Sequence, residues 1–302
     1  MAITIGIDLG GSNIKAALVN PAGNYIYPVI EKTESDQGYK FLMNQVNSII
    51  RALTSLSPEP PTGVGIGVCG LMDKHNRRVV AATNLSMLKG KHIPKDLSEL
   101  GKIPVLMDND VNCMALGEGI AGSAKGKKHY VALTLGTGVG GAVVSGGSFI
   151  SGHQGGGGEI GHVQIHHSGP VCGCGSNGCL ESYIGKQAVH DYITRNYPRL
   201  KGYEISEINK MAEAGDDDAV EVFDYIAKML AVALASVVNI FNPQLIVLGG
   251  GISNAGELII EPLLAEIKKR AFQPYTRSLR IVTAKLGEWA GVIGAGVLAV
   301  EK

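Results

Sequence analysis

The chain has 302 residues, of which 45% are hydrophobic and 18% charged, and 27 basic residues balance 27 acidic ones. This length allows two domains of ordinary size, and the balanced charge argues against nucleic acid or an anionic membrane as the partner. The first residues lack the basic start of a signal peptide, and the longest helix-like apolar run, residues 229–241, is shorter than the roughly 20 residues of a membrane span. We therefore expect a soluble, cytoplasmic protein.

Short β-branched runs alternate with helical spacing along the first third of the chain. A helical pattern extends over about residues 37–56, and the spacing becomes helical again after residue 108. A second set of strands begins at about residue 129. This order predicts an α/β protein. The strands predicted in the first third cover residues 3–9, 14–20, 25–31, 63–69 and 103–108.

Two segments of the chain repeat one pattern. Residues 5–19, IGIDLGGSNIKAALV, match residues 131–145, VALTLGTGVGGAVVS, in their apolar and glycine positions. Each copy predicts a strand, a glycine turn and a second strand, which indicates an internal duplication. Asp8 of the first copy is Thr134 in the second, so only one turn carries a charge.

Glycine turns at strand ends let backbone N–H groups approach an anion closely. The two repeated turns and a third within residues 245–253 indicate a nucleotide held between two domains, although any one of them could be an ordinary hairpin. No Gly-Lys pair is followed by Ser or Thr, so the P-loop signature is absent. Residues 136–141, GTGVGG, continue as strand and loop instead of opening a helix, which argues against a dinucleotide fold.

Three of the five cysteines, Cys172, Cys174 and Cys179, lie within eight positions, and His162 precedes them by ten residues. In a reducing compartment this grouping favours a metal over disulfides, with free thiols as the alternative. Three thiolates and one imidazole form a closed set of the kind that structural zinc takes, which leaves no position for a catalytic water. The neighbouring His166 and His167 are alternative imidazoles.

Acidic residues lie on both sides of the cysteine cluster and in a segment where a strand leads into a helix. Glu159 and Glu181 flank the cysteine cluster, and a carboxylate oxygen pair can accept from adjacent sugar hydroxyls. If the bound nucleotide donates its γ-phosphoryl group, the attacking hydroxyl must lose its proton to a base within reach. Residues 107–112, MDNDVN, offer Asp108 and Asp110 for this role, and their position alone does not choose between them.

Taken together and in order, these segments resemble the ROK family of bacterial sugar kinases and repressors. Residues 6–19 resemble its first phosphate loop, residues 107–118 its catalytic segment and residues 133–144 its second phosphate loop. GGGEIGH, CGCGSNGCLES and IVLGGGIS resemble its sugar, zinc and adenosine-side segments. The resemblance extends from residue 5 to about 296 and implies a two-domain, actin-like (ribonuclease-H-like) α/β fold with a cleft between the domains. We expect a small domain over residues 1–117, a large domain with the zinc loop over residues 118–287, and a C-terminal helix at about residues 288–302 that packs back on the small domain.

The resemblance also implies roles for individual residues. Asp110 would be the catalytic base, while Asp108 would be a helix cap or a solvated acid, and Asp8 would hold Mg²⁺ through water. The sugar-binding residues would be Gly70, Asn84, Asn109, Asp110, Glu159, His162 and Glu181. The nucleotide would contact Asp8, Gly10, Gly11, Ser12, Gly136, Thr137, Gly138, Gly249 and Gly250. The zinc ligands would be His162, Cys172, Cys174 and Cys179.

The implied activity is an ATP- and Mg²⁺-dependent hexokinase that phosphorylates the 6-hydroxyl of a free aldohexose, with glucose as the first choice. Allose, mannose, N-acetylglucosamine and N-acetylmannosamine are the alternatives, followed by a non-catalytic sugar sensor. The sugar stays open because Cys69-Gly70 replaces the family's usual Pro-Gly, and SMLKG replaces a proline-bearing segment. The family's repressors carry a DNA-binding domain before the first phosphate loop, which is not expected here because the first strand starts at about residue 2. We expect a homodimer.

Overall fold

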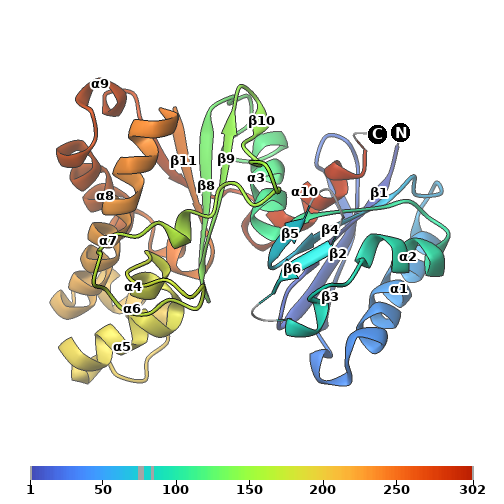
Figure 1. The fold of residues 1–302 in the computed structure, drawn as a ribbon, viewed down its shortest axis with the longest axis horizontal. Coiled ribbons are helices and arrows are strands. Elements are labelled where there is room, and N and C mark those ends of the chain that lie inside the picture. Colours follow the sequence, from blue (N-terminus) through green and yellow to red (C-terminus); the bar gives the residue numbers. More distant parts are fainter. Residues whose placement is uncertain (1, 74–77, 83–84, 301–302) are drawn as a thin grey trace. The chain divides into compact units, whose positions relative to one another are not determined.

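The structure is a computed structural model that describes residues 2–73, 78–82 and 85–300. The chain forms two compact units (Figure 1). Unit 1 comprises Met1–Gly126, Ser151–Gly157 and Lys285–Lys302, and unit 2 comprises Lys127–Ile150 and Gly158–Ala284. The domain boundaries expected from the sequence at residues 117 and 287 stay a prediction.

Unit 1 is built on a five-stranded sheet in the order β3-β2-β1-β4-β7. Strand β1 (Thr4–Leu9) pairs antiparallel with β2 (Asn13–Val19) and parallel with β4 (Val64–Val68). Strand β3 (Tyr25–Lys32) forms one edge and β7 (Val105–Asn109) the other. Four of the strands predicted for this part of the chain agree with these bounds to within one residue, and the fifth, predicted over residues 103–108, starts two residues later and ends one residue later.

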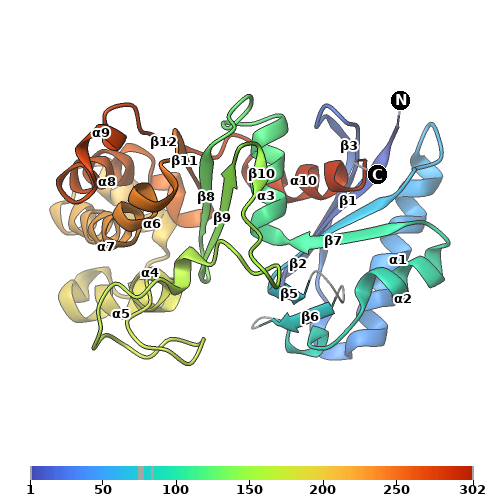
Figure 2. The same ribbon diagram turned by 45° about the horizontal axis from the view of Figure 1, so that its top comes forward.

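Helices cover both faces of this sheet (Figure 2). One face packs on α1 (Tyr39–Leu56) and α2 (Ile93–Gly101), and the other on α3 (Asp110–Ile120) and α10 (Ala290–Leu298). A separate hairpin of β5 (Leu71–Asp73) and β6 (Arg78–Ala81) belongs to the same unit.

Two glycines let α10 lie directly on the sheet. A Cβ atom on Gly6 of β1 would lie 2.0 Å from the carbonyl oxygen of Val292, and one on Gly65 of β4 would lie 1.7 Å from that of Ala295. Any side chain at either position would push the helix off the sheet. The C-terminal segment is therefore an integral layer of unit 1.

Unit 2 repeats the sheet of unit 1, in the order β10-β9-β8-β11-β12. Strand β8 (Tyr130–Leu135) pairs antiparallel with β9 (Val139–Ser145) and parallel with β11 (Leu245–Gly249). Strand β10 (Ser148–Phe149) and β12 (Arg280–Thr283) form the edges. The matched segments 5–19 and 131–145 thus form the same hairpin at the same place in two equivalent sheets.

The longest helix of unit 2, α7 (Asp217–Phe241), contains the apolar run of residues 229–241. The Asp216 side chain accepts a hydrogen bond from the backbone N–H of Ala219 and caps its start. Among the described residues, α7 is the one helix whose length and composition would suffice to cross a membrane, a test that core helices also pass. Its buried face, which includes Phe223, Leu230 and Leu234, belongs to the core of unit 2. The helix is longer than the apolar run predicted, because its first half is more polar.

The remaining helices of unit 2 surround this core. Helix α8 (Glu257–Arg270) packs along α7, and α6 (Ile205–Glu213) begins with a capping box between Glu204 and Glu207. The other helices are α4 (Glu181–Ile184), α5 (Lys186–Asn196) and α9 (Gln273–Thr276).

Candidate functional site

The turn between β1 and β2 presents backbone groups next to an acid. Its ends are closed by a hydrogen bond from the N–H of Gly10 to the carbonyl of Asn13, and Thr33 Oγ1 donates to the Gly10 carbonyl from the neighbouring strand. Ser12 is exposed, whereas Gly10 and Gly11 are partly buried. Asp8 lies in β1, two residues before the turn. The predicted nucleotide-binding groups of unit 1 are thus fixed on one rigid hairpin.

Asp8 is half-buried in an environment that disfavours its charge. Desolvation by burial raises the pKa of its carboxyl group to about 6, while the nearby Lys15 lowers it. Lys15 is directly opposite Asp8 in the β1–β2 register, and its Nζ atom also forms an ion pair with Glu288 at 2.9 Å. A Cβ atom on Gly291 would lie 3.3 Å from Asp8 Cγ. A divalent cation near Asp8 would favour the charged carboxylate and so offset the effect of burial on its pKa.

Lys15 was not predicted as a residue of this site. The signal was present, because Asp8 and Lys15 are equally distant from the centre of the glycine turn and must therefore face each other across the hairpin.

We expect Asp8→Asn to stabilise the ligand-free protein at neutral pH. Because the folded-state pKa of about 6 lies above the usual value of 3.8, the neutral carboxyl contributes stability fully below about pH 4, and this contribution is lost as the pH rises through 6. The full difference corresponds to about 3 kcal/mol as an upper bound. Asparagine carries no charge and should avoid this loss. Urea unfolding of both proteins between pH 4 and 8, without added Mg²⁺ or nucleotide, would contradict this if the two curves ran parallel.

Three polar residues, Asp108, Asn109 and Asp110, lie where β7 ends and α3 begins. Asn109 is the N-cap, and its Oδ1 atom accepts from the backbone N–H groups of Val111 at 2.8 Å and Asn112 at 3.2 Å. Its amide also donates to the carbonyl of Gly70 at 3.1 Å. Asp110 is the first residue of the helix, where a carboxylate is favoured by the helix dipole. These bonds fix the peptide that carries Asp110.

Asp108 is neither the cap nor a solvated acid, so that expectation was wrong. Its side chain is buried, and Oδ1 accepts from the Asn109 backbone N–H at 2.7 Å and from the Asn112 side chain at 2.8 Å. The capping role belongs to Asn109, one residue further on, because the chain leaves the strand after Asn109. Asp108 thus joins the strand end to the helix.

Gly70 lies where β4 turns toward the β5–β6 hairpin. Its φ of 148° is unfavourable for other residues, and a Cβ atom would lie 2.3 Å from the carbonyl oxygen of Ala81. The bond from Asn109 to its carbonyl brings Gly70 together with the start of α3. The predicted sugar-binding residue Asn84 lies outside the described residues.

In unit 2 the β8–β9 turn is joined to Glu181 at the start of α4. Glu181 Oε2 accepts from the backbone N–H of Val139 at 2.9 Å. The N–H of Lys186 donates to the carbonyl of Gly136 at 3.0 Å. Thr137, at the tip of the turn, is exposed. The predicted phosphate turn and one predicted sugar carboxylate are therefore held as one structure.

We expect Gly138→Ala to break this connection. A Cβ atom at Gly138 would lie 2.3 Å from Glu181 Oε2 and displace the carboxylate from Val139, with a loss of about 1–3 kcal/mol in the free energy of unfolding. Gly136→Ala is the matched control, because a Cβ atom there meets nothing within 4 Å. Urea unfolding should separate the two variants, and equal stabilities would contradict the expectation.

Glu159 precedes a short 3-10 helix, Ile160–His162, which ends at His162 and packs on β9. A Cβ atom on Gly161 would lie 1.9 Å from the carbonyl of Val139, so this turn lies against the backbone of the phosphate hairpin. Although the Glu159 side chain keeps an exposed surface, desolvation raises the pKa of its carboxyl group, which His162 lowers and Glu181 raises. The three predicted sugar residues of unit 2 thus influence one another electrostatically.

The third glycine turn follows β11 and leads into a 3-10 helix, Gly251–Ala255, and then α8. Gly250 has a φ of 86°, and a Cβ atom there would lie 2.3 Å from the carbonyl of Leu135 at the end of β8. Gly249 pairs with Thr134 of the same strand. The predicted adenosine-side glycines are therefore adjacent to the second phosphate hairpin.

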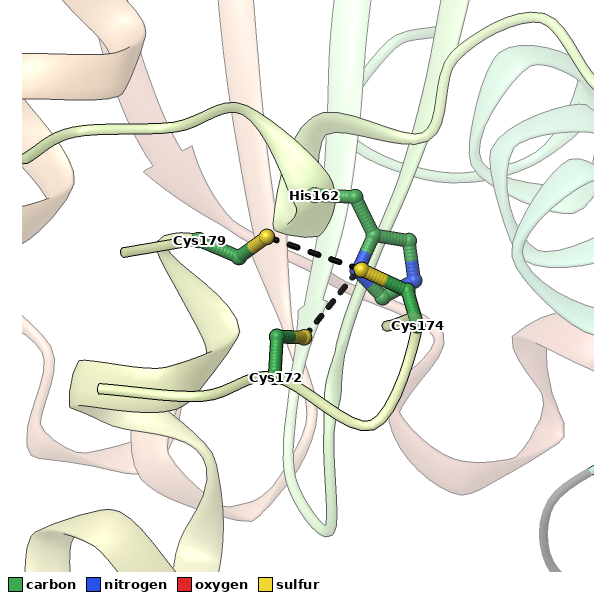
Figure 3. A group of neighbouring side chains, drawn as sticks. All are labelled: His162, Cys172, Cys174 and Cys179. Atoms are coloured by element: carbon green, nitrogen blue, oxygen red, sulfur yellow. Dashed lines mark hydrogen bonds between the residues drawn. The ribbon is translucent and has the colours of Figure 1, made fainter. Parts of the chain in front are cut away.

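His162, Cys172, Cys174 and Cys179 converge (Figure 3), and their ligand atoms all lie within 4.8 Å of one another. His162 Nδ1 is 3.6 Å from Cys172 Sγ, and the sulfur atoms of Cys174 and Cys179 are 3.7 Å apart. A tetrahedral zinc with bonds of about 2.3 Å to sulfur and about 2.0 Å to nitrogen has ligand separations of about 3.5–3.8 Å. The two separations of 3.6 and 3.7 Å match such a site, and the four residues could hold a zinc ion.

The loop that carries the cysteines has little regular structure. It is attached by the isolated bridges of Gln164 with Cys179 and of Val171 with Asn177. Cys172 and Cys179 are buried, and burial raises the pKa of both thiols, to about 12 for Cys179. Because His162 turns Nδ1 toward the sulfurs, its Nε2 atom is available for another partner.

The α/β architecture is that of the two-domain, actin-like ATPases. A family model described as the ROK family matches residues 4–302, and the chain belongs to this family. It is 32% identical over 310 residues to a glucokinase of Thermotoga maritima, covering 99% of this chain and 97% of that one. It is 33% identical over 309 residues to an N-acetyl-D-glucosamine kinase of Photobacterium profundum, covering 98% and 99%. The crystal structure of a ROK family glucokinase from Streptomyces griseus in complex with glucose and AMPPNP matches with a TM-score of 0.87 at 27% identity, covering all of both chains.

Proposed function

We propose that this protein is an ATP-dependent hexokinase that phosphorylates the 6-hydroxyl of a free aldohexose, and that glucose is its preferred sugar. The observation that supports this most strongly is the position of Asp110, on the first turn of α3, within a peptide fixed by the Asn109 cap and the Gly70 carbonyl. Full-length similarity to glucokinases supports the reaction class and the substrates ATP and sugar.

In this proposal the Asp110 carboxylate takes the proton of the 6-hydroxyl as its oxygen attacks the γ-phosphorus of ATP. The bond from the γ-phosphorus to the bridging oxygen breaks, and ADP leaves. Asn109 would orient the sugar with the second N–H of its side-chain amide, since the first is bonded to the Gly70 carbonyl. Asn84 and Gly70 would provide further sugar contacts in unit 1.

The phosphates would meet backbone N–H groups and hydroxyls rather than lysine side chains. In unit 1 the donors would be Gly11 and Ser12, and in unit 2 Thr137 and Gly138. Gly10 and Gly136, whose own N–H groups close the two turns, would let the phosphates approach the backbone, with Gly249 and Gly250 on the adenosine side. Mg²⁺, when bound, would neutralise phosphate charge through water held by Asp8. Most of the acceleration would then come from placement and charge neutralisation.

Glu159, Glu181 and the Nε2 atom of His162 would bind sugar hydroxyls in unit 2. His162 would have two roles, because its Nδ1 atom would bind a structural zinc together with Cys172, Cys174 and Cys179. The support for zinc is the match of ligand separations to a tetrahedral site. Zinc would hold the loop that carries the sugar-binding groups and take no part in bond making.

N-acetylglucosamine is the second candidate, since a relative named for that activity is 33% identical over nearly the whole chain. Allose, mannose and N-acetylmannosamine remain in the comparison. A non-catalytic sensor would not need both Asp8 and Asp110. We further propose that the protein is cytoplasmic and forms a homodimer, which light scattering of the purified protein would test.

A panel of these five sugars with Mg·ATP, followed by ADP release, tests the function. We expect glucose to give the highest kcat/KM. The matched control is 6-deoxyglucose, which keeps the ring but lacks the hydroxyl that receives phosphate and should give no sugar-dependent turnover. Turnover with 6-deoxyglucose would contradict the 6-position, and absence of turnover with every sugar would contradict the kinase.

A further inference from the structure

Glu118 is a completely buried acid near the end of α3 to which the proposed chemistry assigns no role. Both of its carboxylate oxygens accept hydrogen bonds from the backbone. Oε2 accepts from the N–H of Ser123 at 2.6 Å, and Oε1 accepts from the N–H of Leu286 at 2.8 Å. Its main-chain carbonyl accepts from Gly122 at 3.1 Å and from Ala124 at 3.0 Å. One residue thus holds two segments that are far apart in the sequence.

Both segments are adjacent to places where the chain changes unit. Unit 2 starts after Gly126, just beyond Ser123, and the chain returns to unit 1 at Lys285, just before Leu286. The Glu118 carboxylate therefore joins the segment that leaves unit 1 to the segment that returns. Residues 121–126 and 284–286 contain no helix or strand, and hydrogen bonds such as that from the Ala284 N–H to the Leu248 carbonyl at 2.8 Å also hold them.

Helix α3, which carries Glu118, packs closely against α10 in unit 1. A Cβ atom on Gly117 would lie 2.3 Å from the carbonyl of Ala290, and one on Gly294 of α10 would lie 1.7 Å from the carbonyl of Cys113. Helix α10 begins four residues after Leu286, and its backbone is in contact with the backbone of α3. Asp110 is the first residue of α3, and Glu118 lies in its final turn.

We propose that Glu118 is a positioning residue of the phosphoryl transfer. Its carboxylate fixes two of the four segments through which the chain passes between units, the first and the last, to the helix that begins with Asp110. Loosening these segments would misplace groups that must be aligned for an in-line attack, and small misplacements are costly for such reactions. The proposal rests on the proposed function for its effect on turnover, whereas its structural part can be tested without turnover.

Two variants act on the same carboxylate in different ways. Glu118→Gln keeps the size but replaces one acceptor oxygen by an NH₂ group, so one backbone N–H loses its acceptor. Gly122→Ala keeps the carboxylate but places a Cβ atom 2.0 Å from Oε2 and displaces it. We expect each to lower kcat about tenfold or more, with less than about a twofold change in KM for glucose and for ATP. The double variant should be no slower than the slower single variant, because both remove one interaction.

Thr4→Val is the matched control for a purely structural loss. Thr4 is completely buried in unit 1, and its hydroxyl donates to the carbonyls of Val19 at 3.2 Å and Gly296 at 2.8 Å. This variant should lower the free energy of unfolding without lowering kcat at temperatures well below its Tm. If kcat fell in proportion to lost stability in all three variants alike, Glu118 would have only a structural role and the proposal would fail.

Hydrogen exchange tests, without any substrate, whether the Glu118 carboxylate holds the backbone N–H groups of Ser123 and Leu286. In the wild-type protein the amides of Ser123 and Leu286 should be protected, and in Glu118→Gln both should exchange at least about tenfold faster, while the amides of Thr4→Val at these positions should not change. Fast exchange at both amides in the wild type would overturn the proposal, even if Glu118→Gln failed to fold. Protected amides together with kcat values within about twofold of wild type in the variants would overturn the positioning role.

Discussion

Asp110→Asn should lower kcat by about 10²- to 10⁴-fold, the usual contribution of a general base. The amide can still accept the hydrogen bond that Asp110 Oδ1 takes from the Val111 N–H at 3.0 Å, so the start of α3 should stay intact. Only the ability to take the proton of the 6-hydroxyl is removed. ADP release at saturating glucose and ATP, together with a thermal unfolding curve, measures both effects.

Asp108→Asn is the matched control in the same peptide. Asp108 is buried and bonded to Asn112, so its replacement should cost about 1–3 kcal/mol of stability while kcat changes only a few-fold. The two carboxylates were equivalent candidates on position alone, and this pair of variants separates them. Full turnover in Asp110→Asn with a large loss in Asp108→Asn would assign the base to Asp108.

Cys179→Ser should reduce zinc from about one ion per chain to a small fraction of that value, because a structural site depends on all four ligands. Cys179 is completely buried, and Leu180 and Glu181 follow it directly. We therefore expect a lower Tm and a fall of about 10- to 100-fold in kcat/KM for glucose. Metal analysis, thermal unfolding and steady-state kinetics on one preparation check the three effects together.

Cys113→Ser provides the control for zinc, since Cys113 is also buried but lies in α3 of unit 1, outside the cluster. It should keep its zinc content and its KM for glucose. Wild-type protein that contains no zinc and is unaffected by a chelator would contradict a structural metal. Unchanged stability in Cys179→Ser would do the same.

The sheets could be predicted because their strands are short, β-branched and bounded by glycine turns. The repeated pattern in residues 5–19 and 131–145 even indicated the equivalence of the two hairpins, which is borne out by the identical strand orders. The β5–β6 hairpin was not predicted, since its strands are short and its pairing is irregular. The length of α7 was missed because a hydrophobic run marks only the part of a helix that is apolar on most sides.

The candidate site could be predicted in its residues better than in its contacts. The motifs predicted that His162, Cys172, Cys174 and Cys179 form one group, as the structure also shows, but they did not predict that Glu181 accepts a hydrogen bond from the β8–β9 turn. The roles of Asp108 and Asn109 in joining β7 to α3 depend on where the strand ends, to the residue, and sequence patterns define element ends poorly. The partners of Glu118 are 5 and 168 positions away in sequence, and no local pattern reports a backbone donor at that separation.

The placement of α10 has a consequence for synthesis on the ribosome. Residues 292–295 of α10 pack directly on Gly6 of β1 and Gly65 of β4. These helix residues are translated more than 200 residues after the two strands. The side of β1 and β4 that α10 covers therefore stays exposed to solvent until the C-terminal helix has been synthesised. A premature stop within that helix would leave this side of the first sheet exposed in an almost complete chain. Such a product should be bound by chaperones and degraded, even though every proposed substrate-binding residue had already been made.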